Sequence, residues 1–192
     1  MALALQNEDP HAHVVAWTWL SPLVRRILRR TLGPGGDVED LVQEVFLLLF
    51  RRIDGLREPA TLRAFVMGIT VRVARAEIRR RHVRRWIGLA SGPEVLDRGA
   101  VAVDLDSREA LVRFYAVLDR INTRDRTAFV LHHIEGLDLP TVAAALGTST
   151  PTARRCVARA WKRVVLLAER DPRLVEYLQR KKQEGGSARG AR

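Results

Sequence analysis

The chain has 192 residues, and its 33 Lys and Arg against 22 Asp and Glu give a formal net charge of +11. This basic excess favours a polyanionic partner, and the 47% hydrophobic content is sufficient for one domain or two small ones. A single cysteine, Cys156, excludes an internal disulfide, and no apolar run is long enough to cross a bilayer. The start of the sequence lacks the pattern of a secretion signal, so we expect a cytoplasmic protein without membrane insertion. Frequent Ala, Leu, Val and Arg without alternating runs predict an all-α fold.

The first two predicted helices pack apolar stripes inward. The first spans about Val14–Leu32 and ends at LGPGGD, and the second spans Asp37–Phe50 with Asp37 as its N-cap. Their stripes are Trp17, Leu20, Leu23, Val24, Ile27 and Leu28, then Leu41, Val42, Val45, Phe46, Leu48 and Leu49. Asp40, Gln43 and Glu44 lie together at i, i+3 and i+4 on the other surface of the second helix, which indicates a docking surface.

An arginine-rich helix follows a loop that contains glycine and proline. The loop spans Ile53–Thr61, and Thr61 is expected to cap a helix from Leu62 to Trp86. Within this helix the expected buried residues are Val66, Ile69, Val73 and Ile78, and one face carries Arg72, Arg75 and Arg79. The run from 72 to 85 holds seven arginines and one acid, Glu77. So many unpaired like charges disfavour a helix unless a polyanion screens them, which favours nucleic-acid contact over a merely solvated basic face.

Residues 89–107 are rich in Gly, Pro and Asp and predict a linker between two small domains, 1–88 and 108–170. The second domain is predicted to start with two helices, Arg108–Arg120 and Thr123–Glu135. The remainder, 171–192, is predicted as a basic tail with a short helix to Lys182 and an unfolded GGSARGAR end.

Residues 136–164 have the pattern of a helix-turn-helix. Asp138 is expected to cap a short helix that ends at Gly147, and Thr150 to cap a longer helix with Pro151 in its first turn. Small or apolar residues allow the two helices to cross closely: Ala143, Leu146, Ala153 and Val157. The exposed side near the start of the second helix carries Thr152, Arg154, Arg155, Ala158 and Arg159. Arginine there can read guanine in the major groove, although a helical hairpin with solubilising arginines has the same pattern.

The sequence predicts no catalytic site, metal site or cofactor. His132 and His133 are adjacent and cannot face one ligand on a helix, and no acid or cysteine stands at metal spacing from them. Cys156 has no evident base partner and is expected to be a packing residue. The four tryptophans, Trp17, Trp19, Trp86 and Trp161, are expected to anchor cores or interfaces, with base stacking by Trp86 as a minor alternative.

Taken in order, these motifs resemble a bacterial sigma factor of the extracytoplasmic-function type over about Val14–Ala168. The resemblance rests on DVEDLVQEVFLLLF, on LRAFVMGITVRVARAEIRRR and on the stretch from EALVRFYAVLDR to ARAWKRV. It implies a first domain (region 2) that binds the clamp helices of the largest polymerase subunit and opens the minus-ten element. It also implies a second domain (region 4) that binds the flap of the other large subunit and reads the minus-thirty-five element.

The resemblance assigns roles to individual positions. Asp40, Gln43 and Glu44 match polymerase-docking positions. The positions matched to the minus-ten element, where a flipped base is captured and the strand is tracked, are Asp54, Gly55, Leu56, Arg57, Arg72, Arg75 and Arg79. Those matched to the minus-thirty-five element are Thr152, Arg154, Arg155, Ala158 and Arg159. The implied partners are core RNA polymerase and promoter DNA, with an anti-sigma factor as a further candidate.

Several positions depart from the family pattern. Arg72 and Glu77 stand where Asn and Asp are common, Phe65 where Trp is common, and Cys156 where Arg is common, and Pro140-Thr141 replaces an acidic pair. The sequence also leaves room for a sigma-like chain without initiation activity. The main alternative function is a free-standing helix-turn-helix regulator that does not bind polymerase. In such a protein the acidic docking surface and the loop would have no role.

Overall fold

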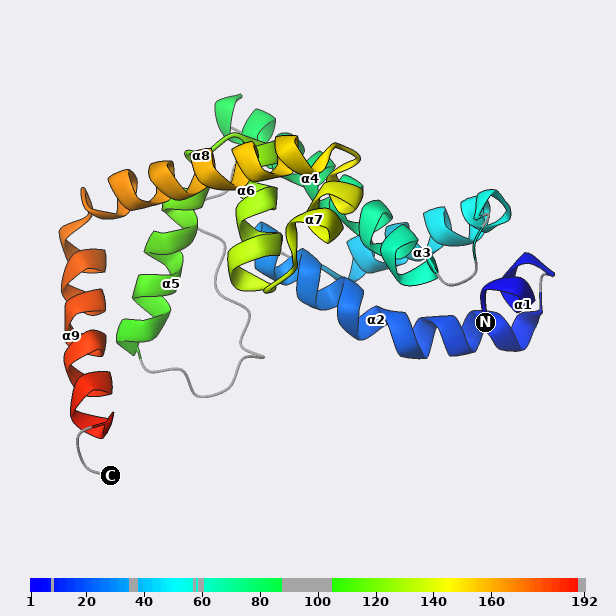
Figure 1. Ribbon diagram of the computed structural model, residues 1–192, viewed down its shortest axis with the longest axis horizontal. Helices are drawn as coiled ribbons and strands as arrows, with labels where there is room; N and C mark the ends of the chain where they lie inside the picture. Colours follow the sequence, from blue (N-terminus) through cyan, green and yellow to red (C-terminus); the bar gives the residue numbers. More distant parts are fainter. Residues whose placement is uncertain (8, 35–37, 57, 59–60, 88–104, 190–192) are drawn as a thin grey trace.

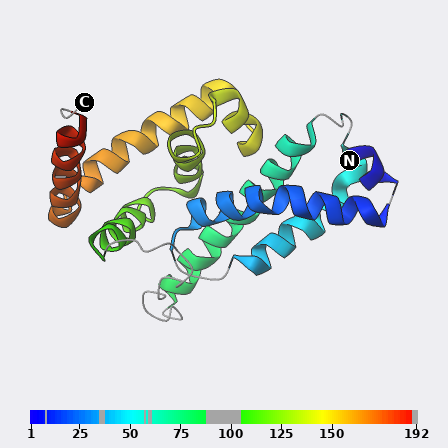
Figure 2. The same cartoon turned by 90° about the horizontal axis from the view of Figure 1, so that it is seen from below.

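A computed structural model describes the chain over residues 1–7, 9–34, 38–56, 58, 61–87 and 105–189, with side chains up to residue 180. Every regular element in these ranges is helical, as the sequence predicts (Figure 1). Helices α1 to α4 form the N-terminal half of the fold, and helices α5 to α9 form the C-terminal half. Two perpendicular views place α1 and α9 at opposite ends of the molecule (Figures 1 and 2).

The N-terminal half is built from one short helix and three long ones. Its helices are α1 (Ala2–Gln6), α2 (Pro10–Leu32), α3 (Glu39–Arg52) and α4 (Leu62–Trp86), with a single 3-10 turn at Ile53–Gly55 after α3. Asp9 caps α2 by accepting a hydrogen bond from the His11 amide at 2.9 Å, which places Pro10 where a missing N–H is harmless. Gly33 ends α2 with φ +87°, a conformation that favours glycine.

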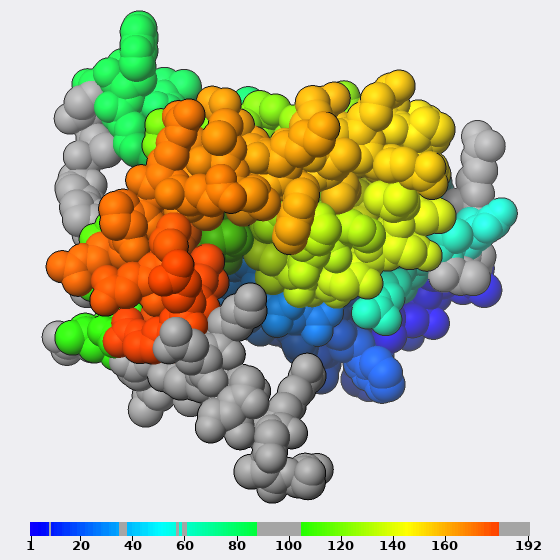
Figure 3. All heavy atoms as spheres, turned by 60° about the vertical axis from the view of Figure 1, so that its left-hand side comes forward, coloured from blue at the N-terminus to red at the C-terminus, as the bar shows by residue number. Residues whose placement is uncertain are grey.

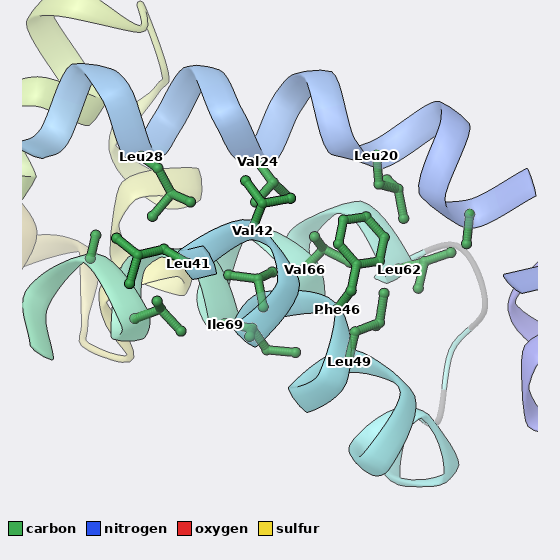
Figure 4. Packing of buried hydrophobic residues seen from close by; sticks show 14 of the residues in the cluster. Leu20, Val24, Leu28, Leu41, Val42, Phe46, Leu49, Leu62, Val66 and Ile69 are labelled. Carbon is green, nitrogen blue, oxygen red and sulfur yellow. The ribbon is translucent and has the colours of Figure 1, made fainter. Parts of the chain in front are cut away.

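The core of this half lies between α2, α3 and α4 (Figure 4). Leu20, Val24 and Leu28 project from α2 toward the side chains of α3 and α4. The α3 and α4 members shown are Leu41, Val42, Phe46, Leu49, Leu62, Val66 and Ile69. Full burial of each such side chain stabilises the fold by about 1.5–3 kcal/mol, so the apolar stripes predicted from sequence suffice to fix the three helices together.

The C-terminal half contains the helix-turn-helix. Its elements are α5 (Leu105–Leu118), α6 (Thr123–Phe129), a π-helical turn (Val130–Ile134), α7 (Leu139–Leu146), α8 (Thr150–Ala168) and α9 (Pro172–Arg189). The Asp138 carboxylate accepts the Thr141 amide at 2.9 Å, and Gly147 ends α7 in the left-handed region at φ +62°. Both features were predicted. The expected crossing residues Ala143, Leu146, Ala153 and Val157 are all buried.

Several local predictions were wrong. Thr61 occupies the N-cap position of α4 as predicted, but its side chain makes no cap hydrogen bond, because its hydroxyl donates to the Glu58 carbonyl. Thr150 is the first residue of α8, and Ser149 occupies the cap position. Helix α9 continues to Arg189, past the expected end at Lys182. Helix α1 was not predicted, since five residues show too little periodicity. The cap expected at Asp37 and most of the expected linker lie outside the described residues.

The tryptophans are also more exposed than expected. Trp19 and Trp86 lie on the surface, and Trp86 is 89% exposed. Trp17 and Trp161 are partly exposed, although each packs against an aromatic ring, Trp17 on Phe46 and Trp161 on His133. None of them is a core residue.

Candidate polymerase and DNA interfaces

The outer face of α3 carries the expected docking residues. Asp40 and Gln43 are exposed and Glu44 is half-buried, while the opposite face of the helix is in the core. The preceding acid, Glu39, does not belong to this surface, because it accepts two hydrogen bonds from Arg25 at 2.9 Å. Leu47 adds a large apolar group to the same face and is 58% exposed. Sequence reasoning missed Leu47, although its i+7 and i+4 spacing from Asp40 and Gln43 was a usable signal.

The loop after α3 is held in place by two buried side chains and by hydrogen bonds from Gln6 of α1. Ile53 and Leu56 insert their side chains into the core, and the Gln6 side-chain amide donates to both of their carbonyls, at 3.1 and 2.8 Å. Asp54 and Gly55 are exposed between these anchors. The Leu56 side chain is therefore buried, and a contact of this expected minus-ten position with DNA would have to involve its backbone. Arg57, Pro59 and Ala60 lie outside the described residues.

The arginines of α4 fall into two groups. Arg72 and Arg79 are exposed, whereas Arg75 is half-buried and its buried Nε has no hydrogen-bond partner among the described residues. Burial lowers the pKa of Arg75, and the nearby charges of Arg79 and Arg124 lower it further. Arg75 thus differs from its two neighbours in having little access to solvent.

Part of the arginine charge on α4 is paired within the chain. Glu77 is buried and accepts ion pairs from three arginines at 3.3, 2.9 and 3.1 Å, namely Arg80, Arg81 and Arg84. A fourth, Arg85, pairs with Asp119 at 2.7 Å. These four arginines share two carboxylates, and Asp119 also pairs with Arg126, so the ion pairs offset only part of the charge. Helix α4 therefore keeps an excess of positive charge, and Arg72 and Arg79 are the exposed members of the three arginines expected to contact DNA.

The helix-turn-helix presents the start of α8 to solvent. Arg154, Arg155, Ala158 and Arg159 are exposed, as expected, whereas Thr152 is half-buried. In Figure 3, α8 runs along the surface above α6 and α7. Thr152 organises this end of the helix, because its hydroxyl lies 2.9 Å from the Ser149 hydroxyl and accepts from Arg155 at 3.0 Å.

Arg159 is committed to an ion pair. Its guanidinium donates to both oxygens of the buried Asp125, at 3.0 and 2.8 Å, and so connects α8 to α6. Burial alone would raise the pKa of Asp125, but hydrogen bonds from Arg159 and Asn122 outweigh burial and hold it below its ordinary value. This partner was not predicted.

The histidines and the cysteine have structural surroundings. His132 Nδ1 lies 2.7 Å from the Leu137 carbonyl, His133 packs on Trp161, and Cys156 is buried in the core. Within the part of the chain that the structure describes, no group of three or more His, Cys, Asp or Glu could hold a metal ion. No described helix is long and apolar enough to span a membrane.

The fold joins a half built on α2, α3 and α4, in which the outer face of α3 carries acidic and amide groups, to a half that contains a helix-turn-helix. Comparison with known proteins identifies a family for each half. Residues 17–84 match Sigma-70 region 2, and residues 111–164 match Sigma-70 region 4. The chain belongs to the bacterial RNA polymerase sigma factors, and its relatives place it in the extracytoplasmic-function type. It is a promoter-specificity subunit, and its partners are core RNA polymerase and promoter DNA.

The relatives cover both halves. The probable sigma-C factor of Mycobacterium bovis is 31% identical over 143 residues, which span 73% of this chain and 74% of that protein. Sigma factor CnrH of Cupriavidus metallidurans is 29% identical over 74% of this chain and 79% of its own length. The extracytoplasmic-function factor SigI of Mycobacterium tuberculosis is 31% identical over 83% of this chain and 56% of its own length.

Two solved structures share the fold. CnrH in complex with the cytosolic domain of CnrY aligns with TM-score 0.62 at 23% identity, over 88% of this chain and 96% of that one. RpoE in complex with the anti-sigma factor NepR from Bartonella quintana aligns with TM-score 0.57 at 22% identity, over 81% and 95%.

Proposed function

We propose that the outer face of α3 binds the clamp helices of core polymerase. The support is geometric: Asp40, Gln43 and Leu47 share one exposed face, and Glu44 stands beside it, on a helix whose other face is fixed in the core. An apolar group within a polar rim is a common composition for a protein interface. The N-terminal half, 1–88, is then the polymerase-docking and minus-ten domain.

The exposed turn at Asp54 and Gly55, together with Arg57, is proposed to receive a flipped base of the minus-ten element. Arg72, Arg75 and Arg79 follow on α4, where they would hold the flanking phosphates. A protein that flips a base must offset a few kcal/mol of unstacking, so a loop held in a fixed shape is an advantage. Gln6 supplies that fixation from α1.

The C-terminal half, 108–170, is proposed to bind the minus-thirty-five element through α8 and the polymerase flap through another of its faces. The observation that carries the assignment is the exposed pair Arg154 and Arg155 at the start of a helix whose other side is buried. Arg154 makes no ion pair with any described residue, so its guanidinium is available to a base. The linker is assigned to 89–107, and the tail to 171–192.

Loss of base specificity is the direct test of this assignment. In full-length protein, Arg154→Ala should lose about 1–3 kcal/mol of discrimination at one or two base pairs of the upstream element. A permuted set of upstream sites would measure it. Uniform weakening at every site would mean that Arg154 contacts phosphate and reads no base.

Such a subunit acts without chemistry of its own, and we propose that it is not an enzyme and that it works in the cytoplasm alongside polymerase. CnrH and RpoE were solved with CnrY and NepR bound, which supports an anti-sigma factor as a candidate partner here. A free-standing regulator is disfavoured, because it would leave the α3 surface without a role. Co-purification of the full chain with core polymerase separates the two functions.

A further inference from the structure

Arg126 connects the two halves of the chain through a buried polar contact. Its side chain is only 2% exposed, and its guanidinium donates to the Thr31 carbonyl at 3.0 and 2.8 Å and to the Leu32 carbonyl at 3.1 Å. These are the last carbonyls of α2, which carry the negative end of the helix dipole and lack partners within the helix. Arg126 also pairs with Asp119. A residue of α6 thereby caps a helix of the other half.

Glu135 forms a second contact in the opposite sense. Its carboxylate is 2% exposed and pairs with Arg26 at 2.9 Å and Arg30 at 3.0 Å, both on α2. Arg30 in addition donates to the Ile134 carbonyl at 3.0 Å. Each half thus supplies cations to the other, and separation of the halves would break these contacts, while Arg126 would keep its ion pair with Asp119.

Close packing joins these polar contacts. The Tyr115 hydroxyl donates to the Arg30 carbonyl at 2.9 Å, and its ring lies so near Gly33 that an added Cβ would come within 2.5 Å of it. Ile27, Met67 and Val71 of the N-terminal half share one apolar cluster with residues of the other half. The other-half members that are buried are Ala128, Leu131, Val142, Ala143, Ala145, Leu146, Ala153, Cys156 and Val157.

This interface partly covers Arg75, one of the three α4 arginines proposed to contact DNA. Met67, Val71 and Arg75 follow one another at i, i+4 and i+8, so they line one side of α4. The first two are buried in the shared cluster, and Arg75 is half-buried with its Nε unsatisfied. The exposed Arg72 and Arg79 lie on either side of it along the chain. Contact between the halves therefore reduces the solvent access of Arg75, the middle one of the three arginines expected to contact the DNA strand.

We propose that the contacts of Arg126 and Glu135 with α2 form an intramolecular latch that holds the free chain in a closed, autoinhibited state. Opening would free Arg75 for the DNA strand, and this part of the inference rests on the proposed function of α4. The closed population lowers the apparent affinity of Arg75 and its neighbours for a single DNA strand in proportion to the fraction of chains that are open.

The test compares two matched pairs of arginines on α2. Arg26→Ala with Arg30→Ala removes both partners of Glu135, whereas Arg25→Ala with Arg29→Ala removes the same charge but only contacts within the N-terminal half, to Glu39, Ser21 and the Trp17 ring. Small-angle scattering of the free full-length chain should show a compact wild type, an expanded Arg26/Arg30 variant and a compact Arg25/Arg29 variant. The expanded variant should bind a fluorescein-labelled single-stranded oligonucleotide about five-fold or more tightly than the Arg25/Arg29 variant, which carries the same charge.

Glu135→Gln provides a second route if the double variant proves unstable by circular dichroism. It keeps the side-chain shape, removes the charge and should also expand the chain. An extended wild type, or folded variants that scatter and bind the oligonucleotide like wild type, would overturn the latch.

The exposure of Arg75 has its own readout. Arg75→Ala should weaken binding to a fluorescein-labelled single-stranded oligonucleotide in the Arg26/Arg30 background and leave it unchanged in the Arg25/Arg29 background. If the chain expands but Arg75→Ala has no effect in either background, the latch stands and the proposed DNA role of Arg75 fails.

Discussion

Arg159 and Asp125 form a two-pronged ion pair that fixes the exposed face of α8 to the buried start of α6. Arg159 therefore has two candidate roles, in DNA contact and in folding, whereas Arg154 has only the first. We expect Arg159→Ala to lower both the melting temperature and the affinity for upstream DNA, because it leaves the Asp125 carboxylate buried without its main partner. Arg154→Ala should lower the affinity alone. Thermal melting and DNA titration of the two variants, side by side, would measure the difference. Equal melting temperatures for both would show that the ion pair contributes no stability.

The Arg159–Asp125 ion pair also predicts that the stability of the fold depends on pH in the acidic range. The pKa of Asp125 in the folded chain lies below its ordinary value of 3.8, despite the opposing effect of burial, because of its hydrogen bonds with Arg159 and Asn122. The group therefore adds stability above that value, and the contribution is lost as the pH falls through the lower folded pKa. The gap in melting temperature between wild type and Arg159→Ala should be largest near neutral pH and should shrink below about pH 4. A gap that stays constant into strong acid would assign the stability to something other than the charge of Asp125.

Docking should depend on charge and on one apolar side chain. Asp40→Arg with Glu44→Arg is expected to abolish binding to core polymerase while helicity is retained, since neither residue is part of the apolar core. Leu47→Ser should weaken binding without any change of charge, because it removes the apolar group from the same face. Glu169→Arg, an exposed acid on the other half, is the matched control. Pull-down with core polymerase and circular dichroism would report the two properties. Retained binding by the folded double variant would remove α3 from the docking surface.

The sequence predicted those features that depend on interactions between residues close together in the chain, such as the ends of α7. Asp138 and Gly147 delimit α7 because a carboxylate cap and a left-handed glycine act within one turn of the helix. Glu77 shows where this approach fails: one acid among seven arginines suggested unpaired charge, yet its position lets three of them reach it. The spacing was present in the sequence, but the direction in which each long side chain turns depends on burial.

Contacts between the halves were out of reach for sequence reasoning. Arg126 lies 95 positions from the Thr31 carbonyl that it contacts, and nothing in the neighbouring sequence separates it from Arg124 or the other arginines of the chain. Glu135 likewise was only the expected end of a helix. The docking face, the helix-turn-helix and the resemblance to sigma factors each follow from short-range spacing, whereas closure of the molecule depends on tertiary packing.

Promoter opening should depend on Gln6, a residue of α1 that is not itself among the expected DNA contacts. Its side-chain amide donates to the carbonyls of Ile53 and Leu56, the two residues that frame the exposed turn of the loop. Gln6→Ala removes both donors and leaves two partly buried carbonyls to find water, at a cost of about 0.5–1.5 kcal/mol for each bond.

This cost falls on the shape of the loop, because α3 and α4 remain fixed by their own core. The variant should therefore bind core polymerase and upstream DNA like wild type but open promoters less completely. A 2-aminopurine base in the minus-ten element would report opening by its fluorescence. Replacement of only Asp54, Gly55 and residues 57–60 by Gly and Ser, with the core residues Ile53 and Leu56 retained, should abolish the signal. Normal opening by both variants would reduce the loop to a connector and leave strand capture to the arginines of α4.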